Sequence, residues 1–405
     1  DFLAQNGVRY TNAYCTNPVC IPSRFSLMTG LYPSAVGMHS NNYKNEIDGN
    51  LPGYIKDNGL GKLMKQAGYN AIYGDKEHLP ATNAQELGFD YICADERDKL
   101  GDVCADYILN HDDSNPYFMV ASFINPHDIC FMAIDDHGHT PEDYKLKNDF
   151  QLEITTMRNA QKLPEGVSEE VFYERICPPL PKNYQPSEDE AEAVSIMLSK
   201  REFKKLARQN YTDQEWRLHR YTYARLTEQV DTQIGKVLDA VIKKGDLDNT
   251  LIIFTSDHGD MDASHKLEHK TILYNECCKI PLVIKGVTKT AGNVICDGLV
   301  SNGLDLIVTV LDYANVVPPA YLTGISLKDT AEQYQMDISR KALVVESEYG
   351  KMAVSKKCKY IEYNIGERAE QYYDFTTNLG ETYNQLHDKE HYDEIKALKK
   401  ILGTN

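Results

Sequence analysis

The chain predicts an α/β fold in which helices cover both faces of a sheet. Continuous apolar runs, typical of strands buried on both faces, occur at 117–124, 251–255 and 280–284. A long amphipathic helix lies between the first two runs. From about residue 331 the pattern changes to short strands followed by one helix. We therefore expect a large α/β domain at 1–330 and a small antiparallel α+β subdomain at 331–405.

Individual elements follow this alternation along the chain. A helix is predicted at 60–67, stopped by Gly68, and a short strand follows at 70–73. The strongest helix starts at a capping box, Thr212 with Glu215, and ends before Gly245. Its apolar residues recur at steps of three and four. Short strands at 342–345, 352–355 and 360–363 and a helix at 393–402 form the predicted C-terminal subdomain.

Residues 131–211 interrupt the alternation. Four prolines lie at 178, 179, 181 and 186, and an acidic run follows at 188–192. This pattern predicts a loop-rich insertion, and such insertions more often shape the rim of a cleft than a core.

Charge and composition exclude several classes of function. The 405 residues carry 43 basic and 60 acidic side chains, a net charge of −17, which argues against a nucleic-acid partner. An anionic substrate must therefore be attracted locally, within a cleft. No apolar run reaches the length of a membrane span. Ten cysteines without a CxxC pair do not fix the redox compartment, and the cellular location stays open, with a periplasmic or secreted location favoured in a bacterium.

The most informative segment is CIPSRFSLMTG at 20–30. Pro22 suits the first turn of a helix and Gly30 suits its C-terminal cap, so Cys20 is expected at a helix N-terminus. Backbone N–H groups and the helix dipole favour an anion there, and Arg24 adds a positive charge one turn later. A buried structural cysteine before a capped helix is the alternative for such a segment.

This segment resembles the signature of the type I sulfatases, C/S-x-P-S/A-R followed, after four intervening residues, by Thr-Gly. Its fixed positions are present as Cys20, Pro22, Ser23, Arg24, Thr29 and Gly30. The resemblance implies an alkaline-phosphatase-like α/β/α sandwich with a mixed, mostly parallel sheet. It also implies that a maturation enzyme oxidises Cys20 to formylglycine. The aldehyde hydrate then offers one hydroxyl to attack sulfur and a second whose deprotonation expels sulfate.

A metal site is expected at the end of the strand at 251–255. Asp257, His258 and Gly259 follow it, where ligands of α/β sheets collect, and they resemble the Ser-Asp-His/Asn-Gly segment of the sulfatases. The resemblance implies Ca²⁺, with Mg²⁺ as the alternative, held by Asp257, His258 and the formylglycine. It also implies acidic ligands from a strand upstream of Asp1, since the first residues resemble the helix that follows that strand. We therefore expect that processing or truncation removed a preceding segment.

Four further side chains resemble sulfatase site residues. Lys76 and His78 lie in GDKEHL at 74–79, which resembles a G-K-x-H-L motif with one inserted residue. Lys76 would neutralise a formylglycine or sulfate oxygen, and His78 would orient the hydrate. His127 follows a strand in an x-x-Pro-His element and is the candidate general acid toward the leaving alcohol. Lys270, which precedes a Tyr-x-Glu and an Ile-Pro-Leu strand, would contact the sulfate.

His265 and His269 are spaced i, i+4 near Cys277 and Cys278, but the Glu of an H-E-x-x-H motif is missing. We therefore expect no zinc site and place one of these histidines at the substrate entrance.

The sequence thus predicts a sulfatase that acts on a sulfated small molecule or saccharide, with a glycosaminoglycan-type sugar preferred. The preference rests on the polar insertion, with His137, His139, Lys182 and Asn183 as candidate sugar-binding residues. Two alternatives stay open at this point: a phosphonate or phosphate ester hydrolase of the same superfamily, and a catalytically inactive, sulfate-binding homologue.

Overall fold

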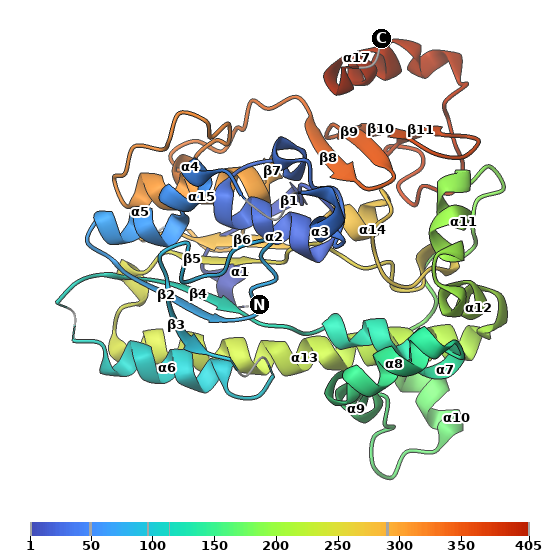
Figure 1. Ribbon diagram of the computed structural model, residues 1–405, viewed down its shortest axis with the longest axis horizontal. Coiled ribbons are helices and arrows are strands. Elements are labelled where there is room, and N and C mark those ends of the chain that lie inside the picture. The colour runs from blue at the N-terminus through green and yellow to red at the C-terminus, as the bar shows by residue number, and fades with distance from the viewer. Residues whose placement is uncertain (1, 48–50, 95–96, 113, 289–290, 404–405) are drawn as a thin grey trace.

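The computed structural model describes residues 2–47, 51–94, 97–112, 114–288 and 291–403 (Figure 1). The strands of the α/β part are β1 (Val8–Tyr14), β2 (Asn70–Asp75), β3 (Asp90–Cys93), β4 (Tyr117–Ser122), β5 (Ile252–Thr255), β6 (Leu282–Lys285) and β7 (Val294–Ser301). Its helices outside the insertion are α1 (Phe2–Gln5), α2 (Cys20–Thr29), α3 (Tyr43–Glu46), α4 (Gly53–Asp57), α5 (Leu60–Gln66), α6 (Leu100–Asn110), α13 (Asp213–Lys244), α14 (Asn275–Cys278), α15 (Asn302–Tyr313) and α16 (Lys328–Ala331). None of the described helices is both long and apolar enough to span a bilayer.

The β layer is mixed and mostly parallel, as expected. Its hydrogen bonds define two groups of strands, β5-β6-β1-β7 and β3-β2-β4. Only β6 runs against its neighbours, since β1 pairs in parallel with β7, and β2 pairs in parallel with β3 and β4. Ile253 of β5 packs in the same hydrophobic cluster as Tyr73 of β2 and Phe118 of β4, so the two groups share one core.

Helices cover both faces of this layer. α15 packs against α2 and α5 on one face, and α6 packs along α13 on the other (Figure 1). The capping box predicted for α13 is present, because the Thr212 hydroxyl accepts from the Glu215 N–H and the Glu215 carboxylate accepts from the Thr212 N–H. This three-layer arrangement confirms the predicted fold class.

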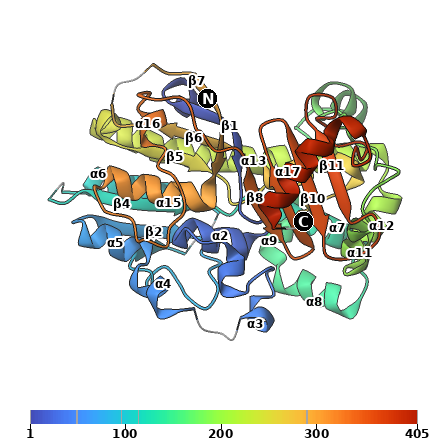
Figure 2. The same cartoon turned by 90° about the horizontal axis from the view of Figure 1, so that it is seen from above.

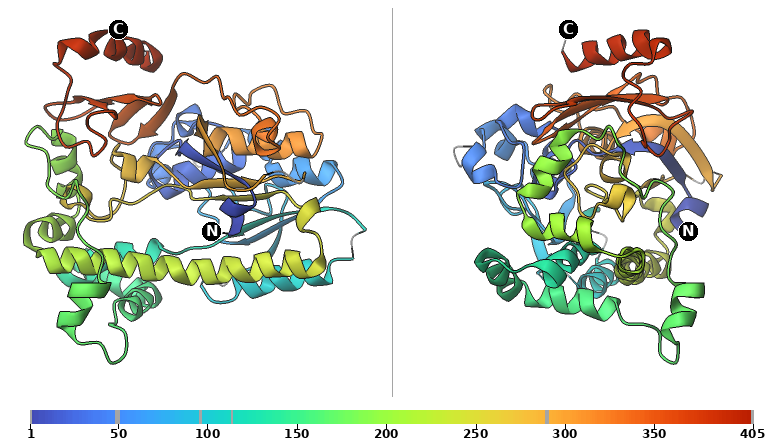
Figure 3. Two further views of the ribbon diagram at one scale, coloured as in Figure 1. Left: turned by 180° about the vertical axis from the view of Figure 1, so that it is seen from behind. Right: turned by 90° about the vertical axis from the view of Figure 1, so that its right-hand side faces the viewer.

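The insertion at 131–211 is mostly helical, so the loop-rich prediction is wrong for most of it. Its helices are α7 (Met132–His137), α8 (Pro141–Asp149), α9 (Gln151–Ala160), α10 (Glu169–Val171), α11 (Glu192–Ser199) and α12 (Glu202–Asn210). Except for α11, whose buried residues join the hydrophobic cluster that contains β1, they gather around the N-terminal half of α13 (Figure 3). Ile154, Met157 and Phe203 form a separate hydrophobic cluster there with Trp216 of α13. These helices are short, so their apolar periodicity is too brief to read from sequence, and the proline-rich loop is confined to 177–191.

The C-terminal part is a four-stranded antiparallel sheet in the order β11-β10-β9-β8, covered by α17 (Tyr392–Leu402) (Figure 2). Its strands are β8 (Leu343–Ser347), β9 (Gly350–Val354), β10 (Cys358–Tyr363) and β11 (Glu370–Asp374). Side chains alternate between its two faces: Tyr360 and Tyr372 pack against α17, whereas Ile361 and Tyr373 join the hydrophobic cluster of β1. The division at residue 331 stays a prediction, because one face of this sheet shares its core with the α/β part.

Candidate active site

Cys20 is the first residue of α2, as its flanking residues predict. Gly30 ends the helix in the left-handed conformation (φ 72°), and a Cβ there would lie 2.4 Å from Leu322. Cys20 is buried, so its side chain faces the cluster of charged groups at the ends of the strands rather than bulk solvent.

The loop after β5 carries Asp257, His258 and Gly259 toward Cys20. The His258 Nε2 lies 3.3 Å from the Cys20 Sγ, while its Nδ1 lies 2.7 Å from the Gly259 carbonyl oxygen. Because a carbonyl only accepts, Nδ1 carries a proton, and Nε2 is the ring nitrogen that faces Cys20. Burial by itself lowers the pKa of His258, but the charges of Asp257 and Cys20 outweigh burial and raise this pKa. Gly259 has no room for a side chain, since a Cβ would lie 1.9 Å from the Glu276 carbonyl oxygen.

Arg24 holds several segments of the site together through its guanidinium group. Its Nε donates to the Asp257 carboxylate at 2.9 Å, and its Nη1 donates to the Lys76 carbonyl at 2.9 Å and the Ser122 hydroxyl at 2.7 Å. One guanidinium therefore ties together the ends of α2, β2, β4 and β5. Burial raises the pKa of the Asp257 carboxyl, but the positive charges of His258, Arg24 and Lys270 outweigh burial and hold this pKa well below its usual range.

The Cys20 thiol lies among positive charges. The Lys270 Nζ donates to Sγ at 3.1 Å. Burial by itself raises the pKa of Cys20, but Lys270, His258 and hydrogen bonds from His258 and His78 outweigh burial and hold that pKa well below its usual range. An oxygen at the same position would likewise be stabilised as an anion.

The remaining predicted site residues lie around the same centre. Burial and the charges of Lys76 and Lys270 hold the pKa of His127 well below its usual range, which places the imidazole within the field of both lysines. His78 is exposed at the edge of the site. The structure thus brings together the eight residues predicted to be catalytic or metal-binding: Cys20, Arg24, Lys76, His78, His127, Asp257, His258 and Lys270.

The donor set suits part of a divalent metal site. One ligand atom each from Cys20, Asp257 and His258 lies within 4.8 Å of the others. A carboxylate oxygen and an imidazole nitrogen fit a hard or borderline cation. Among the described residues, the other such group is Asp388, Glu390 and His391 near α17, and neither group contains the His265–His269 pair weighed for zinc.

His265 is not at a substrate entrance. It is fully buried and stacked on Tyr274, with ring centroids 4.2 Å apart, and burial lowers its pKa to about 4. His269 directly precedes Lys270 and is half-buried, and burial together with the charges of Lys204 and Lys270 holds its pKa well below the usual range.

Two neighbours of the site were not singled out from the sequence. Burial lowers the pKa of Lys204 on α12 and raises the pKa of Glu268, and both side chains interact electrostatically with Lys270. The i, i+3 and i, i+4 pattern of α12 marks its apolar face, but no motif marks Lys204. Only the folding of the insertion onto α13 brings it near Lys270.

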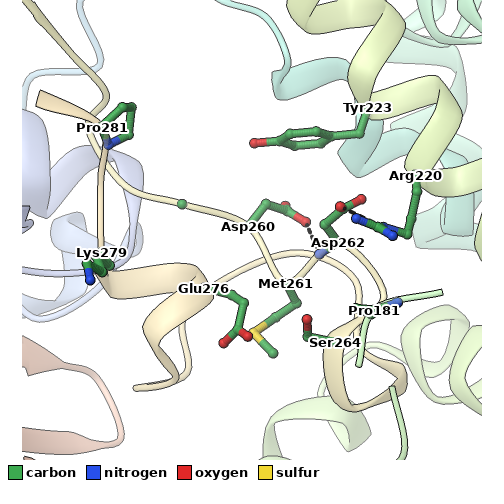
Figure 4. Close-up of a pocket in the computed structure, with 11 residues that line it drawn as sticks. Pro181, Arg220, Tyr223, Asp260, Met261, Asp262, Ser264, Glu276, Lys279 and Pro281 are labelled. Carbon is green, nitrogen blue, oxygen red and sulfur yellow. Dashed lines mark hydrogen bonds and ion pairs between the residues drawn. The ribbon is translucent and has the colours of Figure 1, made fainter. Parts of the chain in front are cut away.

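A cavity of about 390 Å³ borders the loop that follows His258. Tyr223 and Arg220 of α13 line one side, and Asp260 lines the floor, with Arg220 ion-paired to Asp262 (Figure 4). Of the four sugar-binding candidates, Asn183 is near this cavity, because its amide donates to the lining residue Glu276 at 2.7 Å. His139 instead is exposed and faces Glu202 on α12.

A three-layer α/β fold with lysines and histidines around a helix-terminal cysteine defines a hydrolase of anionic esters. The family model described as Sulfatase matches residues 1–316, and the chain belongs to this family. It is therefore a sulfuric ester hydrolase with the alkaline-phosphatase-like fold, and enzymes of this family generally use formylglycine and a divalent metal.

A curated relative agrees with the family, and solved structures agree with the fold. The chain is 28% identical over 425 residues to a Delta 4,5-hexuronate-2-O-sulfatase of Bacteroides thetaiotaomicron, covering 99% of this chain and 82% of the relative. The structure of this chain resembles that of a 2-O GAG sulfatase with a TM-score of 0.80 at 23% identity, and the match covers 100% of this chain and 85% of that chain. A phosphonate monoester hydrolase of Agrobacterium radiobacter shares the fold at a TM-score of 0.71 and 18% identity, covering 99% and 89%.

Proposed function

We propose that this sulfatase hydrolyses a sulfate ester on a saccharide of the glycosaminoglycan type, with Cys20 in its formylglycine form. The observation that carries the proposal is the position of the Cys20 Sγ, 3.1 Å from the Lys270 Nζ and 3.3 Å from the His258 Nε2. In the mature enzyme the formylglycine oxygen takes the place of this sulfur, and this oxygen supplies the nucleophile. The relative named a hexuronate sulfatase supports the saccharide.

Each of the other site residues has a separate role in this reaction. Lys270 and Lys76 hold the sulfate oxygens, and His78 orients the modified side chain. Arg24 keeps Asp257 and the Lys76 backbone in place, a role that its hydrogen bonds to both support. His127 donates a proton to the leaving sugar oxygen.

Removing a sulfate-binding lysine should impair both substrate binding and turnover. Lysines that touch sulfate oxygens stabilise charge in the ground state and the transition state, so Lys270→Ala and Lys76→Ala should each lose about 2–4 kcal/mol in kcat/KM. Steady-state kinetics checks this. Lys285→Ala is a matched control, because this buried lysine lies at the opposite end of β6 and donates to the Thr250 carbonyl. A Lys270→Ala enzyme with unaltered kcat/KM would remove Lys270 from the site.

Asp257 and His258 would hold Ca²⁺, or Mg²⁺ as the alternative, together with the modified Cys20. Such a cation would polarise the sulfate and lower the pKa of the nucleophilic hydroxyl. The ligand atoms of these three residues already converge, which supports this assignment.

Asp257→Asn should weaken metal binding by about 10- to 100-fold or more. A loss of this size is typical even of groups that do not bind the metal and only support a ligand. Calorimetric titration with Ca²⁺ measures this directly, and excess Ca²⁺ should restore part of the activity. Asp135→Asn is the control, because it also breaks an arginine–aspartate pair, with Arg158, but on the insertion. Wild-type Ca²⁺ affinity in Asp257→Asn would count against the metal assignment.

The substrate class is tested by offering defined sulfated mono- and disaccharides, a nitrophenyl sulfate and phosphate monoesters to the mature enzyme. We expect sulfate release to be fastest from a sulfated uronic acid or hexosamine. The cavity beside Asp260 has the size of a saccharide site and presents hydroxyl and carboxylate groups to bind sugar hydroxyls. A preference for phosphate or phosphonate esters would instead favour the related hydrolase activity.

A further inference from the structure

The loop that carries Lys270 has an unfavourable backbone conformation. His269 and Thr271, on either side of Lys270, have φ values of 81° and 95°. Residues other than glycine rarely adopt such angles, and a β-branched threonine is especially disfavoured. A conformation of this kind persists only where the surrounding structure holds it.

The C-terminal sheet holds this loop through its backbone. The Ser347 hydroxyl, at the end of β8, donates to the Thr271 carbonyl at 2.8 Å. The Lys359 ammonium, on β10, donates to the Leu273 carbonyl at 2.7 Å. The Glu381 carboxylate, in the segment that follows β11, accepts from the Asn275 N–H at 3.2 Å. Figure 1 shows this sheet directly above α14, which begins where the loop ends.

Two of these groups form a fully buried ion pair. The Lys359 Nζ lies 2.7 Å from the Glu381 carboxylate, and the two side chains are 0% and 1% exposed. The ammonium also lies over the ring of Tyr274, 5.9 Å from its centroid. A buried pair of this kind gains little stability over an apolar pair, because both charges must be desolvated. Its specific contribution here is that each charged group also binds one backbone group of the loop.

The same loop is tied to the start of α2. The Thr271 N–H donates to the Pro18 carbonyl at 3.1 Å, two residues before Cys20. The backbone that follows Lys270 is therefore fixed both to the start of α2 and to the C-terminal part of the chain.

We propose that Ser347, Lys359 and Glu381 are positioning residues that set the Lys270 ammonium against the reacting group at position 20. This inference rests on the proposed role of Lys270 in binding sulfate. On this proposal the C-terminal part of the chain contributes to the geometry of the active site, although none of the three side chains touches the reacting group.

A double-mutant cycle tests this dependence. Ser347→Ala should lower kcat/KM by about 3- to 10-fold, as expected for one lost neutral hydrogen bond. The paired variant Lys359→Met/Glu381→Gln removes both charges together, so no lone charge stays buried, and should lower it by about 10-fold or more. If both act through Lys270, each loss should nearly vanish when measured in Lys270→Ala, because the group they position is gone.

Ser355→Ala is the matched control for Ser347→Ala. Ser355 lies in the same sheet, but its hydroxyl bonds only within the β9–β10 turn, where it donates to the Cys358 carbonyl. It should leave kcat/KM unchanged, and thermal unfolding should show all variants folded. Losses of equal size in the Lys270→Ala and wild-type backgrounds would overturn the proposal. Wild-type kcat/KM in Lys270→Ala alone would overturn the role of Lys270 itself, and that failure is visible before the cycle is completed.

Discussion

Replacing Cys20 with alanine should reduce sulfate release to the level of the uncatalysed reaction. Alanine cannot be converted to an aldehyde, so the side chain that Lys270 and His258 surround would carry no nucleophile. The positively charged side chains around position 20 would remain in place, and the variant should still bind inorganic sulfate. The measurement is sulfate release from a sugar sulfate over long incubation, compared with the protein-free reaction.

The control is Cys104→Ala, which removes another buried cysteine, on α6, that packs with Cys93 in a separate hydrophobic cluster. This variant should keep full activity if it stays folded. Sustained turnover by Cys20→Ala, at any rate clearly above that of the protein-free reaction, would rule out Cys20 as the source of the nucleophile.

His127→Ala should cost about 10²–10⁴-fold on a sugar sulfate and much less on a nitrophenyl sulfate. A sugar oxygen leaves only with a proton, whereas nitrophenolate leaves without one. In the free protein, burial, Lys76 and Lys270 hold the pKa of His127 low, so the imidazole is neutral at neutral pH. A bound sulfate ester adds negative charge beside the two lysines and raises this pKa again.

The pH dependence follows from the same shift. The acid form of His127 is lost as pH rises through its lowered pKa, so kcat/KM on a sugar sulfate should fall from acidic toward neutral pH. This fall should be absent with nitrophenyl sulfate and in His127→Ala. His139→Ala, which removes an exposed histidine of the insertion, should change neither substrate's profile. Equal losses on both substrates would make His127 a positioning residue rather than the acid.

The sequence predicts most of the site because its residues follow strand ends or open a helix. Cys20 lies in a segment whose proline and glycine define a helix, and Asp257 follows an apolar strand. Both can be placed by local rules. The carboxyl ends of β2, β4 and β5 then bring Lys76, His127 and Asp257 to one edge of the β layer.

The supporting residues could not be predicted in the same way. Lys204, Ser347 and Lys359 lie in ordinary amphipathic segments, and their proximity to Lys270 depends on how the insertion and the C-terminal sheet pack. The insertion helices were also not predicted, because they are short and because most of them bury their apolar faces against α13 rather than against the central β layer. The positions of the supporting residues and of the insertion helices both depend on contacts between segments that are distant in sequence. Local periodicity carries no information about such contacts.

The most direct test of the account is the mass of the peptide that contains Cys20, measured in enzyme taken from a preparation with proven sulfatase activity. We predict that this peptide carries formylglycine, with the CH₂SH group replaced by CHO, and that the modified fraction rises in proportion to specific activity across preparations. Full activity in a preparation whose Cys20 peptide carries only the unmodified thiol would contradict the account.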